Sequence, residues 1–415
     1  MTKKAQQLEI LPPAKKMELT ADGYIGYFQE YVLTSSFQPI FSFAHNSPIG
    51  YEALLRVTDI KNQSVPPSDL FYSIDDLDEL LQLELISRNI HILNFFSENT
   101  DDALLFLNVN PSLINSSKFC LKQLLEMLNE NNIPPTRIVI EFVEESYTDT
   151  EILIKASKYL KQSGCLIAID DFGAGHSNFN RVWDLKPNIV KLDKSLIKKI
   201  RQDSWFYKPM LNLIELLHES ESLVLIEGVE DESDAKLAHK LNLDLHQGYF
   251  FGKPKPRPFT QNVANYYINN NNKIHFSNTY EQTDNTISSH LKFLLSEAAM
   301  GTQATFDLTI SCKGLLSHPS VRLCYLLNKN GTQISDAVYG EYSPLNLTHL
   351  YGKISNTHNV NWSRRIYFQR AISNPMIIQS TRPYLSLTSG QLCITLSMAI
   401  DINSALYVLC CDLKL

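Results

Sequence analysis

The sequence has no long hydrophobic run and no C-x-x-C motif, and basic residues are not in excess. No segment reaches the roughly 20 apolar residues that a transmembrane helix needs, and the N-terminus lacks the apolar core of a signal peptide. The seven cysteines are scattered and odd in number, so we interpret them as core thiols in a reducing compartment. A net charge of -7, from 37 Lys and Arg against 44 Asp and Glu, argues against a protein that binds nucleic-acid polymers. We therefore expect a cytoplasmic chain without a membrane span.

Short apolar runs that each end on an acid, an amide or a lysine recur through the first 250 residues. The residues at these ends are Asn108, Glu141, Asp170 with Asp171, Lys191 and Glu227, and Glu52 lies in a further run over residues 49–56. Ionised side chains beside a core are costly unless something positive binds them. The repeated pattern predicts an acidic ring on the rim of a barrel, with metal ions held between the acids.

Strands alternate with helices between residues 37 and 250, which is typical of an α/β barrel. The runs over residues 37–43 and 49–56 are joined by a connection too short for a crossover helix, so we expect these two strands to be antiparallel. Apolar periodicity predicts helices over residues 76–96, 152–160 and 211–218, and another that begins at Ser233 as its N-cap. The predicted fold is α/β: a modified (β/α)8 TIM-type barrel with one antiparallel strand.

The composition and the predicted secondary structure of the chain change after residue 258. An Asn-rich stretch and a helical pattern over residues 290–300 come first. Strand-like runs follow at residues 321–327, 331–334, 377–381, 393–398 and 405–412. We predict a mobile leader over residues 1–24, a barrel over 25–258, a linker with a helix over 259–300, and an α+β regulatory domain over 301–415.

The predicted acidic ring offers oxygen ligands alone. The six side chains are Glu52, Asn108, Glu141, Asp170, Asp171 and Glu227. Oxygen ligands suit hard ions such as Mg²⁺ or Mn²⁺, and the lack of a His or Cys cluster disfavours zinc. Five carboxylates are too many for one ion, whereas two ions that share a bridging carboxylate suit phosphoryl chemistry. Lys191 would orient or deprotonate a metal-bound water, or stabilise charge on phosphate oxygens.

Eight short motifs occur in a fixed order around these residues. They are Gln38-Pro39-Ile40, Glu52-Ala53-Leu54-Leu55-Arg56, Asn108-Val109-Asn110-Pro111, Glu141-Phe142-Val143-Glu144, Asp170-Asp171-Phe172-Gly173-Ala174-Gly175, Lys191-Leu192-Asp193, Glu227-Gly228-Val229-Glu230 and Gln247-Gly248-Tyr249. In this combination they resemble the EAL family of cyclic di-GMP phosphodiesterases over residues ~25–258. A lone Glu-Ala-Leu would carry no information, but all eight motifs in this order are specific.

The resemblance implies a role for each matching residue. It makes Glu52, Asn108, Glu141, Asp170 and Glu227 ligands of two Mg²⁺ or Mn²⁺ ions, with Asp171 bridging them or holding the second ion. Lys191 and Glu52 would be catalytic, and Gln247 would position the nucleophilic water. Gln38, Arg56, Asp193 and Glu230 would contact the substrate. Glu144 would brace a loop that contains Phe172, Gly173 and Gly175 and links a homodimer interface to the metals. The implied reaction is hydrolysis of cyclic di-GMP to linear pGpG.

Three departures from the family pattern keep an alternative open. Val143 stands where threonine is usual, Asn110 where serine is common, and His176 where an aromatic residue is frequent. Losing one hydrogen bond around the metal ligands weakens metal affinity or activity by roughly 10–100-fold. The alternative is therefore a catalytically weak or inactive EAL domain that acts as a cyclic di-GMP receptor or protein-interaction module.

Two further interpretations compete with the phosphodiesterase. An enolase-like barrel also combines strand-end acids with a lysine base, although the Asp-Asp-Phe-Gly turn and the pair Gln38 and Arg56 disfavour it. Taken singly, each residue also has a purely structural explanation: Asp193 or Glu230 would cap a helix, and Asn108 would satisfy backbone groups in a turn.

The second domain has one segment of unusual composition, at residues 361–368. This Asn-Trp-Ser-Arg-Arg-Ile-Tyr-Phe stretch resembles a segment of PAS/Cache-like sensor domains. Arg365 and Tyr367, with Tyr384 opposite, would then contact a small carboxylate ligand. Otherwise Trp362 and Tyr367 are core aromatic residues and Arg365 braces a loop.

Overall fold

The computed structural model describes most of the chain in two compact units. The described residues are 16–98, 100, 102–109, 113, 118–142, 150–174, 179–241, 243–258, 288–343, 357, 359–381, 383–386 and 391–414. One unit comprises Met1–Pro39, Gly50–Ile167 and Lys253–Phe259, and the other comprises Ile40–Ile49, Ala168–Gly252 and Thr260–Leu415. Each unit is described by itself.

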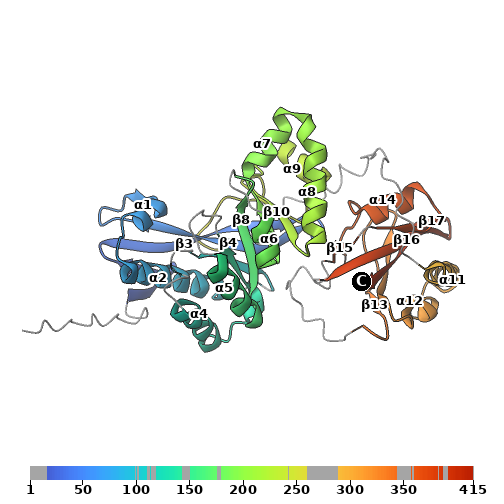
Figure 1. Cartoon of the computed structure of the whole chain (residues 1–415), viewed down its shortest axis with the longest axis horizontal. Helices are drawn as coiled ribbons and strands as arrows, with labels where there is room; N and C mark the ends of the chain where they lie inside the picture. The colour runs from blue at the N-terminus through green and yellow to red at the C-terminus, as the bar shows by residue number, and fades with distance from the viewer. Residues whose placement is uncertain are drawn as a thin grey trace, which may run out of the picture. The chain divides into compact units, whose positions relative to one another are not determined.

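The first unit contains the early strands and the helices that follow them (Figure 1). Its strands are β1 (Met17–Thr20), β2 (Gly23–Phe28), β3 (Tyr31–Ser42, whose end lies in the second unit), β4 (Ser47–Thr58), β5 (Ser64–Val65), β6 (Leu104–Val109) and β7 (Ile138–Phe142). Its helices are α1 (Pro67–Tyr72), α2 (Leu77–Phe96), α4 (Lys118–Glu130), the short η2 (Pro135–Arg137) and α5 (Thr150–Gln162). β1, β2 and β3 form an antiparallel ribbon, whereas β4, β6 and β7 are parallel.

One sequence prediction is confirmed in this unit, and another is partly wrong. The helix predicted over residues 76–96 is α2, and Asp76 caps it by accepting hydrogen bonds from the backbone N–H of Asp78 and Glu79. The predicted leader is wrong over residues 17–24, because β1 and the start of β2 lie there and pair with each other. Residues 1–15 of that leader lie outside the described residues.

The second unit continues the alternation of strands and helices. Its strands are β8 (Leu166–Phe172), β9 (Ile189–Leu192), β10 (Leu223–Ile226) and β11 (Leu245–Gln247). Its helices are α6 (Phe179–Leu185), α7 (Lys194–Gln202), η3 (Ser204–Phe206), α8 (Tyr207–Glu219) and α9 (Glu232–Lys240). The predicted cap of α9 is wrong: Asp231 accepts the backbone N–H of Asp234, and Ser233 lies inside the helix and donates its hydroxyl to Asp231.

The strand order confirms the predicted barrel. The order is β1-β2-β3-β11-β10-β9-β8-β7-β6-β4-β5, and β3 also pairs with β4. The path from β3 through β11 to β4 therefore closes on itself. β3 runs antiparallel to β11, whereas β8 pairs with β9, β9 with β10 and β10 with β11 in parallel. Because the carboxyl ends of parallel strands share one edge, this topology brings the strand-end acids within each unit to one edge of its strands.

A second sheet of six strands follows in the second unit. Its strands are β12 (Val321–Asn328), β13 (Val338–Tyr339), β14 (Gln379–Ser380), β15 (Tyr384–Leu385), β16 (Leu392–Ile402) and β17 (Ala405–Lys414). Its helices are α11 (Ser289–Thr305), α12 (Leu308–Ser311), α13 (Lys313–Leu316) and α14 (Ile366–Ser373). The strand pairings among the described residues of this sheet are antiparallel, so the predicted α+β character is present. Residues 331–334, predicted as a strand, make only isolated bridges.

The two faces of this second sheet have different chemistry because side chains alternate along a strand. Cys324 and Leu326 of β12 and Cys411 of β17 belong to an apolar core with α11, α12 and α13; Figure 1 draws α11 and α12 beside the sheet. Tyr325 and Asp412, which alternate with these residues, line a small pocket on the other face.

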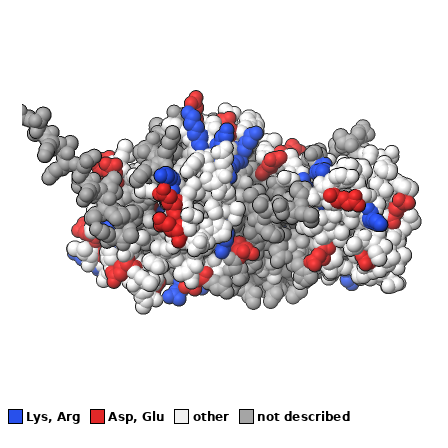
Figure 2. Space-filling model, turned by 90° about the horizontal axis from the view of Figure 1, so that it is seen from below, with Lys and Arg blue, Asp and Glu red and all other residues white. Residues whose placement is uncertain are grey.

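The surface and the thiols agree with the compositional analysis. The six described cysteines are buried and free. Among the described helices, none combines the length and apolarity that crossing a membrane requires. On the face drawn in Figure 2, acidic and basic side chains are interspersed.

Candidate functional site

Three predicted metal ligands lie on neighbouring strands of the first unit. Asn108 of β6 pairs with Glu141 of β7, and Glu52 of β4 pairs with Phe106, two residues before Asn108. The side-chain amide of Asn108 donates a hydrogen bond of 2.9 Å to Oε1 of Glu52. Glu52 and Glu141 are buried, whereas Asn108 is exposed. The strand register therefore gathers two buried carboxylates and one amide.

A cavity of about 330 Å³ lies beside this group in the first unit. Its wall includes Arg56 and Asn108, and also Arg88 and His91 from α2, which the sequence did not single out as site residues. Burial, and then the charge of Arg56, lower the pKa of His91 to about 3, so its ring is neutral at pH 7. This ring bonds to the hydroxyl of Ser35 at 2.8 Å. The cavity therefore presents two guanidinium groups and a neutral imidazole to any ligand that enters.

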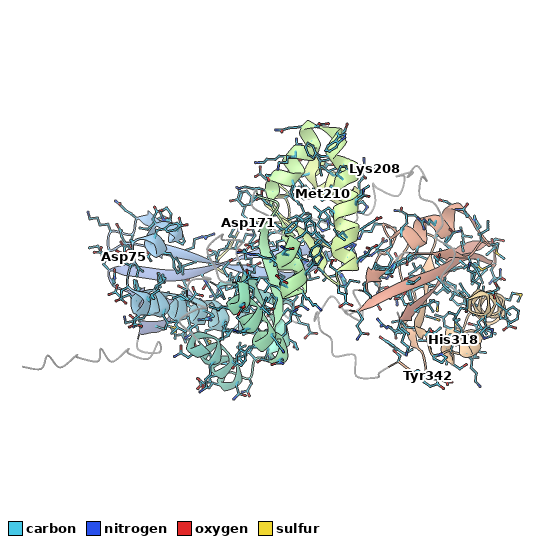
Figure 3. The ribbon with its side chains drawn as sticks, in the orientation of Figure 1. Asp75, Asp171, Lys208, Met210, His318 and Tyr342 are labelled. Atoms are coloured by element: carbon cyan, nitrogen blue, oxygen red, sulfur yellow. The ribbon has the colours of Figure 1, made fainter. Side chains whose placement is uncertain are left out.

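Three further predicted ligands converge in the second unit. Oxygen atoms of Asp170, Asp171 and Glu227 all lie within 4.8 Å of one another. The two adjacent aspartates reach the same place because β8 has a register shift between Ile169 and Phe172, and Asp171 has a φ of 56°. Figure 3 marks Asp171 at this end of β8. The strand is thus interrupted at Asp171 itself, two residues before Gly173.

Lys191 lies between two of these carboxylates. Its Nζ is 2.9 Å from Oδ1 of Asp170 and 2.8 Å from Oε1 of Glu227, and its side chain is fully buried. The register explains the geometry: Lys191 on β9 pairs with Leu225, and the backbone N–H of Glu227 donates to the carbonyl of Leu192. A buried ammonium beside acids offsets part of their mutual repulsion.

The other predicted site residues differ in burial and in the elements that carry them. Gln247 is buried on β11 beside Ile40, and Gln38 is half-buried on β3. Asp193 caps α7 by accepting the backbone N–H of Ser195 at 2.9 Å, so its structural role is present. Glu230 is exposed.

Phe172 and Gly173 follow the aspartates directly. Phe172 pairs with Leu192, and Gly173 has a φ of 98°, which favours glycine. The predicted loop residues Glu144 and Gly175 lie outside the described residues, as do the departures Asn110, Val143 and His176.

In the second sheet, the arginine predicted to meet a ligand carboxylate meets a protein carboxylate instead. Arg365 donates to Oδ1 of Asp244 at 2.9 Å, and Arg364 donates to the carbonyl of Leu243. The other oxygen of Asp244 contacts Nε2 of His218 at 2.7 Å and accepts the backbone N–H of Val224 at 3.0 Å. No local pattern predicts this cluster, because Arg365 and Asp244 lie 121 residues apart in the chain.

The donor set of the second unit fits a hard divalent cation. Carboxylate oxygens within 4.8 Å of one another match the ligand type and the spacing that Mg²⁺ and Mn²⁺ prefer. Among the described residues no His or Cys belongs to this cluster of ligands, which argues against zinc at this place.

Comparisons with known proteins point in the same direction. A family model described as the EAL domain matches residues 28–254. Cyclic di-GMP phosphodiesterase RocR of Pseudomonas aeruginosa is 25% identical over 238 residues, which cover 56% of this chain and 58% of RocR. Cyclic di-GMP phosphodiesterase PdeF of Escherichia coli is 26% identical over 212 residues, which are 50% of this chain and 28% of PdeF. The chain thus spans less than two thirds of these relatives.

One relative matches along almost the whole chain. The EAL-domain protein YkuI of Bacillus subtilis is 25% identical over 392 residues, 90% of this chain and 92% of YkuI. Its crystal structure, with substrate c-di-GMP and calcium, has a TM-score of 0.51 at 20% identity over 92% of this chain and 96% of that one. The c-di-GMP-bound standalone EAL protein of Vibrio cholerae has a TM-score of 0.50 at 29% identity, over 55% of this chain and 95% of that one. These likenesses support an EAL-type barrel.

Proposed function

The chain belongs to the EAL domain family, and from this premise we propose that it hydrolyses one phosphodiester bond of cyclic di-GMP to give linear pGpG. The observation that carries the proposal is the convergence of Asp170, Asp171 and Glu227 around a position suited to a divalent ion, with Lys191 beside them. The relatives named as phosphodiesterases and the c-di-GMP complex of the Vibrio cholerae protein support the same substrate.

Two Mg²⁺ or Mn²⁺ ions complete the proposed site. Their ligands would be Glu52, Asn108, Glu141, Asp170, Asp171 and Glu227. Bound ions supply Lewis-acid polarisation of the phosphodiester and a nucleophilic water of lowered pKa.

The side chains of the protein perform the other tasks. Lys191, buried and positively charged, orients the attacking water or stabilises negative charge on the phosphate oxygens. Gln247 is buried on β11 and positions that water through its amide group. Arg56, in the wall of the 330 Å³ cavity, pairs with a phosphate, and Gln38 contacts the substrate from β3. Asp193 and Glu230 contribute at the guanine bases.

Regulation is the third part of the proposal. The second sheet and its helices act as a PAS-like regulatory domain. The barrel works as a homodimer, in which Glu144 and the loop after Asp171, including Phe172, Gly173 and Gly175, connect the dimer interface to the metals.

Product analysis tests the proposal directly. Purified full-length protein is incubated with cyclic di-GMP and Mn²⁺, with an EDTA control, and pGpG is quantified. Glu52→Ala and Lys191→Ala are expected to lower turnover by roughly 100-fold or more, since each removes a ligand or a charge that the reaction needs. Lys158→Ala, at an exposed position of α5, is the matched control and keeps full activity. Undiminished pGpG production by Lys191→Ala would reject the assigned roles.

The alternative function gives a different result in the same experiment. Val143, in place of the usual threonine, favours a receptor that holds cyclic di-GMP without cutting it. Such a protein binds cyclic di-GMP in a titration with Ca²⁺ and yields no pGpG with Mn²⁺. Absence of both binding and turnover would exclude both functions.

A further inference from the structure

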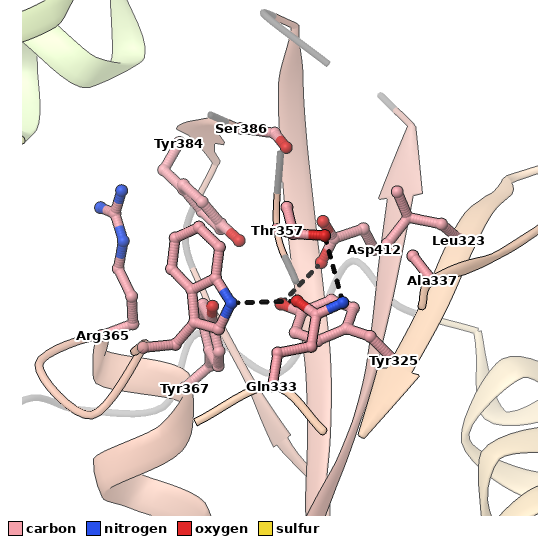
Figure 4. A pocket seen from close by; sticks show the side chains of 11 residues that line it. Leu323, Tyr325, Gln333, Ala337, Thr357, Arg365, Tyr367, Tyr384, Ser386 and Asp412 are labelled. Atoms are coloured by element: carbon pink, nitrogen blue, oxygen red, sulfur yellow. Dashed lines mark hydrogen bonds between the residues drawn. The ribbon is translucent and has the colours of Figure 1, made fainter. Parts of the chain in front are cut away.

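The second sheet contains a small pocket whose lining includes none of the proposed phosphodiesterase residues. Its volume is about 20 Å³, which is room for one water-sized group. Four aromatic side chains line it, together with one carboxylate and one guanidinium (Figure 4). The aromatic residues are Tyr325, Trp362, Tyr367 and Tyr384.

The carboxylate of this pocket belongs to Asp412, which is 3% exposed. Its Oδ1 accepts the hydroxyl of Thr395 at 2.7 Å and lies 3.5 Å from the hydroxyl of Tyr325. Among the described residues, no ion pair within 4.0 Å involves Asp412, and both side-chain hydroxyls that bond to its carboxylate bond to Oδ1 rather than Oδ2. A buried carboxylate normally has a charged partner in contact, so this one has an unused capacity to bind a cation.

The guanidinium in the wall does not fill that role. Arg365 pairs with Asp244 at 2.9 Å, and Figure 4 shows its guanidinium directed away from Asp412. Arg322, the next basic residue that influences Asp412, donates to the side chain of Gln391. Burial raises the pKa of Asp412 to about 6, although Thr395 and Arg322 oppose the rise. At pH 7 Asp412 is therefore largely ionised, and both arginines are engaged elsewhere.

The aromatic side chains of the pocket can also stabilise a bound cation. The rings of Tyr367 and Tyr384 stack with centroids 6.2 Å apart, and the rings of Tyr325 and Tyr367 meet edge to face at 6.4 Å. Aromatic faces attract cations through their quadrupole. Burial raises the pKa of Tyr325, Tyr367 and Tyr384 well above the usual value, so these hydroxyls stay neutral and can accept hydrogen bonds from a donor.

We propose that this pocket binds an ammonium group, either the ammonium ion or the charged end of a small primary amine, with Asp412 as its counter-ion. An ammonium group is close to water in size and offers several N–H donors, which match Asp412 Oδ2 and the tyrosine oxygens. This assignment differs from the small carboxylate predicted for Arg365, because the guanidinium of Arg365 is paired with Asp244, whereas Asp412 has no ion pair within 4.0 Å. It does not depend on the proposed phosphodiesterase activity.

Thermal unfolding of the full-length protein at pH 7 tests the proposal. The three tryptophans, Trp183, Trp205 and Trp362, all lie in the second unit, so their fluorescence reports on that unit. The probes are ammonium chloride and methylammonium chloride, compared with potassium and tetramethylammonium chloride at equal ionic strength. A ligand that binds only the folded state raises the melting temperature as its concentration exceeds Kd.

The variants are Asp412→Asn and, as a matched control, Asp401→Asn at an exposed acid of β16. Ammonium and methylammonium are expected to raise the melting temperature of the wild type and of Asp401→Asn, with an apparent Kd at least tenfold weaker in Asp412→Asn. Equal stabilisation by potassium would overturn the ammonium assignment, as would an undiminished shift in Asp412→Asn. If Asp412→Asn fails to fold, the wild-type preference for ammonium over potassium decides the question, and its absence overturns the proposal.

Discussion

Replacing Asp244 with alanine is expected to destabilise the second unit by about 3–5 kcal/mol, because this substitution leaves buried charge without its partner. Asp244 is 1% exposed and contacts Arg365, His218 and the backbone N–H of Val224. Arg365 is itself 4% exposed, so without Asp244 its guanidinium is neither paired there nor hydrated.

The pH dependence of this effect has a definite sign. Burial alone would raise the pKa of Asp244, but the charges of His218 and Arg365 outweigh it and hold the pKa well below its ordinary value. An acid with a lowered folded-state pKa stabilises the fold above its unfolded pKa, at about 4, and loses that contribution as the pH falls through the folded value. The difference between wild type and Asp244→Ala should therefore be full at pH 7 and shrink below about pH 4.

Urea unfolding followed by tryptophan fluorescence measures the loss. With a urea slope near 3 kcal/mol per molar, the midpoint should fall by roughly 1 M or more. The control is Glu232→Gln, which breaks an exposed pair with Lys236 on α9 of the same unit and should cost less than about 0.5 kcal/mol. In the double variant with Arg365→Ala the two losses should not add, because each single change already breaks the same pair. A midpoint for Asp244→Ala equal to that of the control would refute the reasoning.

Three other predictions follow from single features. Gly248→Ala is expected to destabilise the barrel, since a Cβ at this position would clash with the backbone of Val229. Thermal unfolding followed by circular dichroism measures this loss, and an unchanged melting temperature would contradict the prediction. The first unit should lose stability as the pH falls from about 6.5 towards 3, because His91 takes up a proton in the unfolded chain and not in the folded one. If a His91→Asn variant showed the same acid sensitivity in urea titrations, this explanation would be wrong. Mn²⁺ should raise the melting temperature of the wild type more than that of Asp170→Asn, and EDTA should abolish the difference; equal shifts would place the ion elsewhere.

Local pattern was sufficient to predict much of the barrel. Apolar runs that end on Asn108, Glu141, Asp170 and Lys191 are β6, β7, β8 and β9, because a buried parallel strand must be apolar until its carboxyl end. The helix after Asp76 was equally clear, since its N-cap and its apolar periodicity agree.

Features that depend on distant partners were not predictable. Nothing near Asp244 or Arg365 in the sequence indicates that they meet, because pattern analysis sees only neighbours along the chain. The sequence pattern places Asp412 at the end of a predicted strand but does not indicate that its side chain faces the pocket rather than the helices. The cap of α9 was misplaced by two residues, since Asp231 and Ser233 are both good caps and only the backbone geometry chooses between them.

The unusual backbone of Asp171 restricts which residues this position can accept. A positive φ of 56° is tolerated by glycine, asparagine and aspartate but strains branched side chains. The proposed metal role requires a carboxylate, which glycine and asparagine lack. Aspartate alone thus combines tolerance of this φ with a carboxylate. Substitution by glycine or asparagine would keep the backbone conformation but remove the charge, and glutamate would keep the charge only at a conformational cost.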